Sequence, residues 1–128
     1  MTSVLIVEDH ELLGQILARY LKQKGHIDVS AVLPSAEEAL AQLDKMAVDA
    51  VLVDVSLPGM SGIELVAQLQ RKEPDLPCLM LSAHADNQYV KRARKAGARG
   101  YVIKGDPRLI LRGLEQVLNG GGFFEATG

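Results

Sequence analysis

Short, unbroken apolar runs alternate with segments of helical periodicity along the chain, and this alternation constrains the fold more than any other feature. Three runs are apolar at every position, at residues 4–7, 51–53 and 79–81. Such runs are typical of strands buried on both faces, as in a parallel sheet. Residues 27–32 alternate in polarity, as an edge strand does, and residues 101–103 are a fifth strand candidate.

The segments between these runs carry the start and stop signals of helices. Ser35 and Ser61 are each followed three residues later by glutamate, which predicts a capping box at the start of a helix. Asp106 followed by proline predicts a third start, and Gly97 ends a weaker helix predicted over residues 86–96. The predicted apolar stripes are Leu12, Leu13, Ile16, Leu17, Tyr20 and Leu21; Ala39, Leu40, Leu43 and Met46; Leu65, Val66 and Leu69; and Ile110, Leu111, Leu114, Val117 and Leu118.

Five units of a strand followed by a helix predict an α/β fold, with a parallel sheet covered by helices on both faces. Right-handed crossovers favour a doubly wound, flavodoxin-like sheet, for which 2-1-3-4-5 is the common order of five strands. The 128 residues fit one domain, which we expect to span residues 1–119. Residues 120–128 begin with three glycines that break the last helix, and we interpret them as a linker start or a frayed tail.

The composition excludes several classes of protein. The net charge of −2 argues against direct nucleic-acid binding, which needs a basic excess. The single cysteine, Cys78, makes no internal disulfide and lies in an apolar run, as a core residue would. Residues 4–7 are too few for a signal peptide core, and no stretch reaches the roughly 20 apolar residues of a membrane span. We therefore expect a cytoplasmic domain without a membrane partner.

Polar residues with complementary chemistry follow four of the five predicted strands. Ligands of doubly wound sheets bind outside the carboxyl ends of the strands, where the strand order reverses. These residues are therefore expected to converge at one edge of the sheet. They are Glu8 and Asp9, Asp54, Ser82 and Lys104.

This combination points to phosphoryl transfer. Three clustered carboxylates repel one another without a cation, and Mg²⁺ (or Mn²⁺) prefers such oxygen ligands. An aspartate such as Asp54 can attack phosphorus and form an aspartyl phosphate. Lys104 could offset the charge on the phosphoryl oxygens, and Ser82 could donate a hydrogen bond to one of them.

Four motifs resemble those of a known family, the receiver domains of two-component response regulators. They are residues 4–10 (VLIVEDH), 53–62 (VDVSLPGMSG), 81–83 (LSA) and 100–104 (GYVIK), and the resemblance covers nearly the whole chain. It implies a phosphorylation-dependent signalling switch, not a turnover enzyme, that takes part in its own phosphorylation and dephosphorylation. The implied phosphodonor is a histidine kinase or a phosphotransfer protein.

The resemblance also assigns roles to individual residues. It implies that Asp54 is the phosphoacceptor and that Ser82 and Tyr101 rearrange on phosphorylation. The implied metal ligands are the side chains of Glu8, Asp9 and Asp54 and the backbone carbonyl of Ser56.

The chain departs from many receivers at Gly105, where proline commonly follows the lysine. Residues 100–107 instead resemble the subfamily whose receivers precede a helix-turn-helix DNA-binding domain. This implies control of transcription through an output domain absent from these 128 residues, and contact with DNA only through that domain. A receiver fragment and a stand-alone receiver both stay open, as does a homodimer that forms on phosphorylation.

Two other functions remain to be weighed. A hydrolase similar to the haloacid dehalogenases would need a second aspartate where the chain has Ser56, and a flavodoxin-type cofactor module would need a loop rich in glycine where residues 8–11 are mostly acidic.

The basic run at residues 91–95 is either a solvated helix face or a partner surface. His10 is expected to be solvated, and His84 could influence how water reaches the phosphoryl group.

Overall fold

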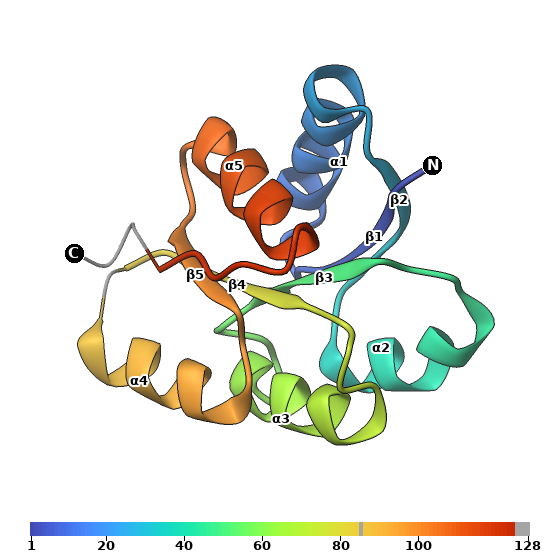
Figure 1. Cartoon of the computed structure of the whole chain (residues 1–128). Coiled ribbons are helices and arrows are strands. Elements are labelled where there is room, and N and C mark those ends of the chain that lie inside the picture. The colour runs from blue at the N-terminus through green and yellow to red at the C-terminus, as the bar shows by residue number, and fades with distance from the viewer. Residues whose placement is uncertain (85, 125–128) are drawn as a thin grey trace.

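A five-stranded parallel sheet lies between two layers of helices in the part of the chain that the computed structural model describes, residues 1–84 and 86–124 (Figure 1). The strands lie in the order β2-β1-β3-β4-β5, so the predicted fold class and strand order are confirmed. The strands are β1 (Ser3–Val7), β2 (Asp28–Leu33), β3 (Ala50–Asp54), β4 (Cys78–Ser82) and β5 (Gly100–Ile103). The helices are α1 (Glu11–Gly25), α2 (Ala36–Gln42) with the short 3₁₀ helix η1 (Leu43–Lys45), α3 (Gly62–Lys72), α4 (Asn87–Ala96) and α5 (Pro107–Leu118).

The predicted helix starts are present as hydrogen-bonded caps. The hydroxyls of Ser35 and Ser61 each accept a backbone N–H three residues on, at 3.2 Å. Asp106 accepts the N–H of Arg108 at 3.0 Å, ahead of a proline in the first turn of α5. His10 was expected to be solvated; it is exposed, and its Nδ1 also caps α1 by accepting the N–H of Leu13 at 3.1 Å.

Apolar side chains fill both sides of the sheet, and β3 and β4 are buried along their whole length. Figure 1 shows α1 and α5 on one face and α2, α3 and α4 on the other. Cys78 is fully buried at the start of β4, and burial raises the pKa of its thiol to about 12. The sheet is therefore a rigid support for the residues that follow its carboxyl ends.

The first predicted stripe is wider than the face that α1 buries. Leu17 and Leu21 are buried, but Leu12 and Ile16 are 66% and 56% exposed.

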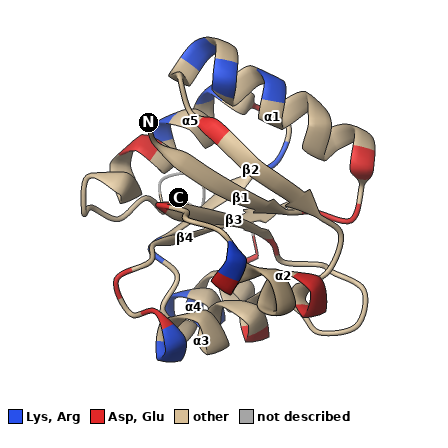
Figure 2. Ribbon diagram, turned by 90° about the vertical axis from the view of Figure 1, so that its right-hand side faces the viewer, with Lys and Arg blue, Asp and Glu red and all other residues tan. Residues whose placement is uncertain are grey.

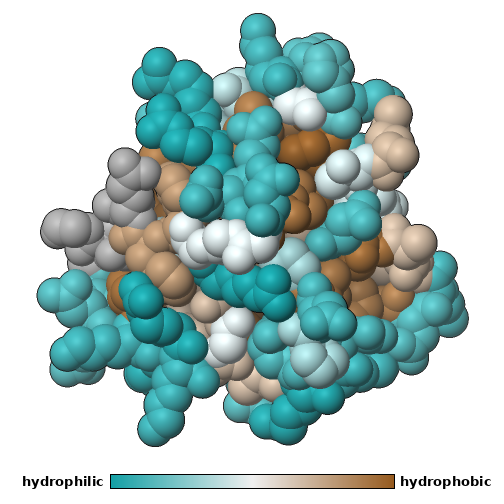
Figure 3. Space-filling view, in the orientation of Figure 1, coloured by the Kyte–Doolittle hydropathy of each residue, from teal (hydrophilic) through white to brown (hydrophobic). Residues whose placement is uncertain are grey.

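Hydrophilic residues cover most of the face shown in Figure 3, and apolar residues reach the surface between α5 and α1. Acidic and basic residues are interspersed over the ribbon in Figure 2. No helix in the described ranges is long and apolar enough to cross a membrane.

The chain turns back after α5 and runs beside β5 (Figure 1). Phe123 forms a parallel bridge to Gly100, with its N–H donating to Arg99 O at 2.9 Å and its carbonyl accepting the N–H of Tyr101 at 2.8 Å. Residues 120–124 of the predicted tail thus lie against the domain, whereas residues 125–128 fall outside the described residues. A domain boundary at residue 119 stays a prediction.

Candidate functional site

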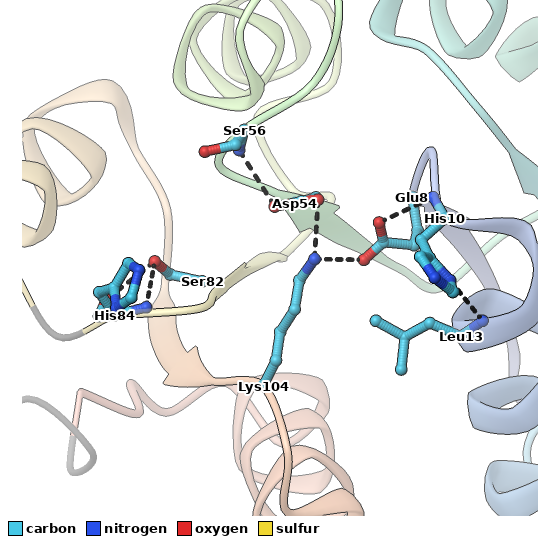
Figure 4. A network of polar contacts seen from close by, with 8 residues as sticks. All are labelled: Glu8, His10, Leu13, Asp54, Ser56, Ser82, His84 and Lys104. Atoms are coloured by element: carbon cyan, nitrogen blue, oxygen red, sulfur yellow. Dashed lines mark hydrogen bonds and ion pairs between the residues drawn. The ribbon is translucent and has the colours of Figure 1, made fainter.

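A buried ion-pair cluster lies at the carboxyl ends of β1, β3 and β5 (Figure 4). The Lys104 Nζ atom is 2.6 Å from Glu8 Oε1 and 2.8 Å from Asp54 Oδ2. The side chains of Glu8 and Asp54 are 2% and 5% exposed, and that of Lys104 is 19% exposed. The sequence predicted that these residues converge, and the structure places one ammonium between two carboxylates.

Backbone hydrogen bonds just beyond the strand ends hold these residues in place. The N–H of Glu8 donates to Leu33 O at 2.9 Å, and the N–H of Lys104 donates to Ser82 O at 2.7 Å. Glu8 and Lys104 therefore each extend the hydrogen bonding of the sheet by one residue beyond the strand. This explains how residues far apart in the sequence reach one position at the sheet edge.

The loop after β3 folds back against Asp54. The N–H of Ser56 donates to Asp54 Oδ1 at 3.0 Å, and the N–H of Gly62 donates to Val55 O at 3.2 Å. A Cβ atom at Gly62 would lie only 1.9 Å from the Asp54 carbonyl oxygen, so a side chain cannot fit there without movement of the loop. The loop's close packing thus orients both the Asp54 carboxylate and the Ser56 backbone.

Gly105 explains the departure noted after Lys104. Its φ is +111°, in the region that favours glycine. Proline is held near −65°, so it cannot adopt this backbone conformation.

The charges within the cluster are unevenly compensated. Burial raises the pKa of Glu8, although Lys104 and the N–H of His10, which donates to Glu8 Oε2 at 3.1 Å, oppose that effect. Burial by itself would lower the pKa of Lys104, but its contacts with Asp54 and Glu8 outweigh burial and raise that pKa. Lys104 is therefore a stable cation, while Glu8 resists ionisation.

The donor set fits a divalent cation. Glu8, Asp9 and Asp54 each offer a carboxylate oxygen, and these atoms lie within 4.8 Å of one another. Glu8 Oε1 is the only buried side-chain nitrogen or oxygen among the described residues that lacks a hydrogen-bond partner, and its contact is the ion pair with Lys104. One ammonium cannot neutralise three ionised carboxylates. Mg²⁺ is commonly held by one or two carboxylates together with waters and phosphate.

Ser82 and Tyr101 meet at a backbone carbonyl and not at Asp54. The Ser82 hydroxyl donates to His84 O at 2.8 Å, and the phenol of Tyr101 donates to the same oxygen at 3.4 Å. Tyr101 is fully buried, and burial raises the pKa of its phenol. Figure 4 shows Ser82 turned toward His84. Sequence reasoning missed this shared acceptor because a carbonyl has no residue-type signature.

The chain belongs to the response regulator receiver domain family, whose family model matches residues 4–122. The response regulator UvrY of Escherichia coli K12 is 34% identical over 121 residues, which are 94% of this chain and 56% of UvrY. The DNA-binding transcriptional activator DevR/DosR of Mycobacterium tuberculosis is 36% identical over 104 residues, or 81% of this chain and 48% of that protein. The chain thus spans about half the length of these curated relatives.

Solved structures agree with this assignment. A two-component response regulator of the LuxR family from Aurantimonas sp. SI85-9A1 superposes with a TM-score of 0.90 at 26% identity, covering 97% of this chain and 90% of that one. The resemblance predicted from the sequence, including its subfamily, is confirmed. A receiver is a signalling domain of two-component systems, which favours the switch over the hydrolase and the flavodoxin-type module.

Proposed function

We propose that Asp54 is the phosphoacceptor of this receiver and that Lys104 compensates the charge of the transferred group. The observation that supports this most is the buried Asp54 carboxylate, which has the Lys104 ammonium at 2.8 Å and the N–H of Ser56 at 3.0 Å. These donors are already in place before any phosphoryl group arrives. Preorganised donors of this kind stabilise charge that develops during a reaction.

The reaction that fits this site is transfer from a phosphohistidine of a kinase or a phosphotransfer protein. An Asp54 oxygen forms a bond to phosphorus while the bond from phosphorus to the imidazole nitrogen breaks, and the imidazole takes up a proton. Lys104, which contacts Asp54 at 2.8 Å, then offsets the charge on a phosphoryl oxygen. Hydrolysis of the aspartyl phosphate by water resets the domain, so the chain takes part in its own chemistry without being a turnover enzyme.

Glu8, Asp9 and Asp54, with the backbone carbonyl of Ser56, would hold Mg²⁺ or Mn²⁺. The cation would supply positive charge to the phosphoryl oxygens. The acidic cluster within 4.8 Å and its incomplete compensation by Lys104 support this assignment.

The phosphoryl group would be read out through Ser82 and Tyr101. The group adds negative charge and acceptor oxygens, to which the Ser82 hydroxyl can turn. The output is control of transcription in the cytoplasm through a DNA-binding domain outside these residues, with homodimerisation as one route. The description of DevR/DosR as a DNA-binding transcriptional activator supports this output.

Intact mass spectrometry after exposure to acetyl phosphate tests the proposal. Wild type should gain one phosphoryl group in a reaction that needs Mg²⁺, and Asp54→Asn should gain none because the amide is not a nucleophile. Asp44→Asn, which changes an exposed carboxylate, is the matched control and should label normally. Normal labelling of Asp54→Asn would show that another residue is the acceptor.

A further inference from the structure

The segment after α5 contacts β5, α5 and α4. Phe123 is 6% exposed, and its backbone is hydrogen-bonded to Arg99 and Tyr101 of the β5 region. Its ring packs over Gly113 of α5, where a Cβ atom would approach the ring to 2.7 Å. Phe123 therefore fixes the segment to β5 and α5.

The next residue, Phe124, contacts α4 and is also partly buried against the core cluster that contains Tyr101. The guanidinium of Arg94 lies over the ring of Phe124, 3.8 Å from its centroid, which is the geometry of a cation–π contact. Arg94 is in the last turn of α4. We call this Arg94–Phe124 contact the clasp, and it joins α4 to the end of the described chain.

The clasp is connected to the candidate switch through the start of α4. The Ser82 hydroxyl holds the carbonyl of His84, which precedes α4 by a few residues. Within the described residues, α4 buries only Val90 and Ala93, so few side chains fix its position. A change at His84 can therefore move α4, and Arg94 with it.

From this arrangement we propose that the clasp stabilises the unphosphorylated form and opens when Asp54 is phosphorylated. The inference rests on the proposed function, because Ser82 must leave the His84 carbonyl to reach a phosphoryl oxygen. Phe123 stays docked, since its contacts are to β5 and α5, whereas Phe124 is released from α4. The phosphorylation state is thus transmitted to the chain that follows Phe124.

Thermodynamic linkage gives this proposal a measurable consequence. If phosphorylation weakens the clasp, then loss of the clasp must strengthen binding of a phosphoryl mimic by the same factor. A cation–π contact at an exposed site is strong enough for a change of about two- to fivefold. Arg94→Ala and Phe124→Ala should each tighten beryllofluoride binding by that factor in the presence of Mg²⁺.

The experiment is an NMR titration with beryllofluoride, followed at the backbone amide of Lys104. Arg92→Ala is the matched control, because it removes the same charge from the same helix but from a residue that lies over Tyr89 at 5.8 Å. Arg94→Lys keeps the charge and loses the planar stacking, so it should also tighten binding.

The outcomes separate this inference from the proposed function. Tighter binding by both alanine variants and unchanged binding by Arg92→Ala is the expected result. Unchanged or weaker binding by Arg94→Ala and Phe124→Ala would overturn the clasp and leave Asp54 as the phosphoacceptor. A wild-type domain whose Lys104 signal does not respond to beryllofluoride would overturn both.

Discussion

Replacing Lys104 by methionine tests whether its ammonium acts as an internal counter-cation for the metal-free site. Methionine keeps much of the length and apolar volume of lysine but has no charge. At the two N–O distances of 2.6 and 2.8 Å, an effective dielectric constant of about 20 gives a gross attraction of about 6 kcal/mol for each pair. The cost of burying the ammonium offsets much of this. We expect a net loss of about 3 kcal/mol in the free energy of unfolding, as for other broken buried pairs.

Divalent cation should reverse about half of that loss. Without Lys104 the clustered carboxylates repel one another fully, so Mg²⁺ relieves more repulsion in the variant than in wild type. A gain of about 1.4 kcal/mol corresponds to tenfold tighter binding, and we expect a change of about that size. Urea unfolding in EDTA and at a series of Mg²⁺ concentrations measures both quantities.

Lys72→Met is the matched control, because Lys72 pairs with Asp44 at 3.1 Å on the surface, with side chains 41% and 66% exposed. Exposed pairs contribute about 0–1 kcal/mol, and this one is not connected to the acidic cluster. The reasoning is refuted if Lys104→Met loses no more stability than Lys72→Met, or if Mg²⁺ binds Lys104→Met no more tightly than wild type.

Three further predictions concern neighbouring residues. Ser82→Ala should remove the hydrogen bond to His84 O, so beryllofluoride should shift the NMR signals of Tyr101 less than in wild type. Equal shifts would show that Ser82 does not transmit the change from Asp54 to Tyr101. The pKa of Glu8 is raised above its usual 4.5, so ionisation of Glu8 lowers the stability of the folded domain as the pH rises. In urea unfolding at neutral pH, metal-free Glu8→Gln should therefore have a free energy of unfolding equal to or above that of wild type. This difference should vanish below pH 4.5. If Glu8→Gln were clearly less stable than wild type at neutral pH, the ion pair with Lys104 would contribute more than the cost of burying the Glu8 charge. Gly62→Ala should lower the free energy of unfolding by about 1–3 kcal/mol, because the added Cβ would meet the Asp54 carbonyl oxygen. Thermal unfolding should show this as a lower midpoint, and an unchanged midpoint would show that the loop adapts freely.

Periodicity and cap signals predicted the parts of this molecule that depend on local sequence. The unbroken apolar runs identified β1, β3 and β4, and residues 101–103 identified β5. The ends of β1, β3 and β5 then located Glu8, Asp54 and Lys104 at one edge of the sheet. Strand ends are predictable because every parallel strand delivers its carboxyl end to the same side.

Contacts made by backbone atoms or by distant segments could not be predicted in this way. The His84 carbonyl that receives both Ser82 and Tyr101 has no residue-type signal. Ile16 fits an apolar stripe as well as Leu17 does, yet Leu17 is buried and Ile16 is exposed. The docking of Phe123 on β5 depends on the return of the chain after α5, which glycines permit but do not specify.

The reactivity of the buried Cys78 thiol measures local opening of the domain. It is the only cysteine of the chain and lies on a central strand, so a thiol reagent can reach it only when the sheet around β4 opens. When reclosing is faster than reaction, the labelling rate measures the population of that open form. A ligand bound only by the closed domain lowers this population, so Mg²⁺ at ten times its dissociation constant should slow the reaction by about tenfold. The reaction rate of this one buried thiol therefore reports the occupancy of the acidic edge, and no label has to be engineered into the chain.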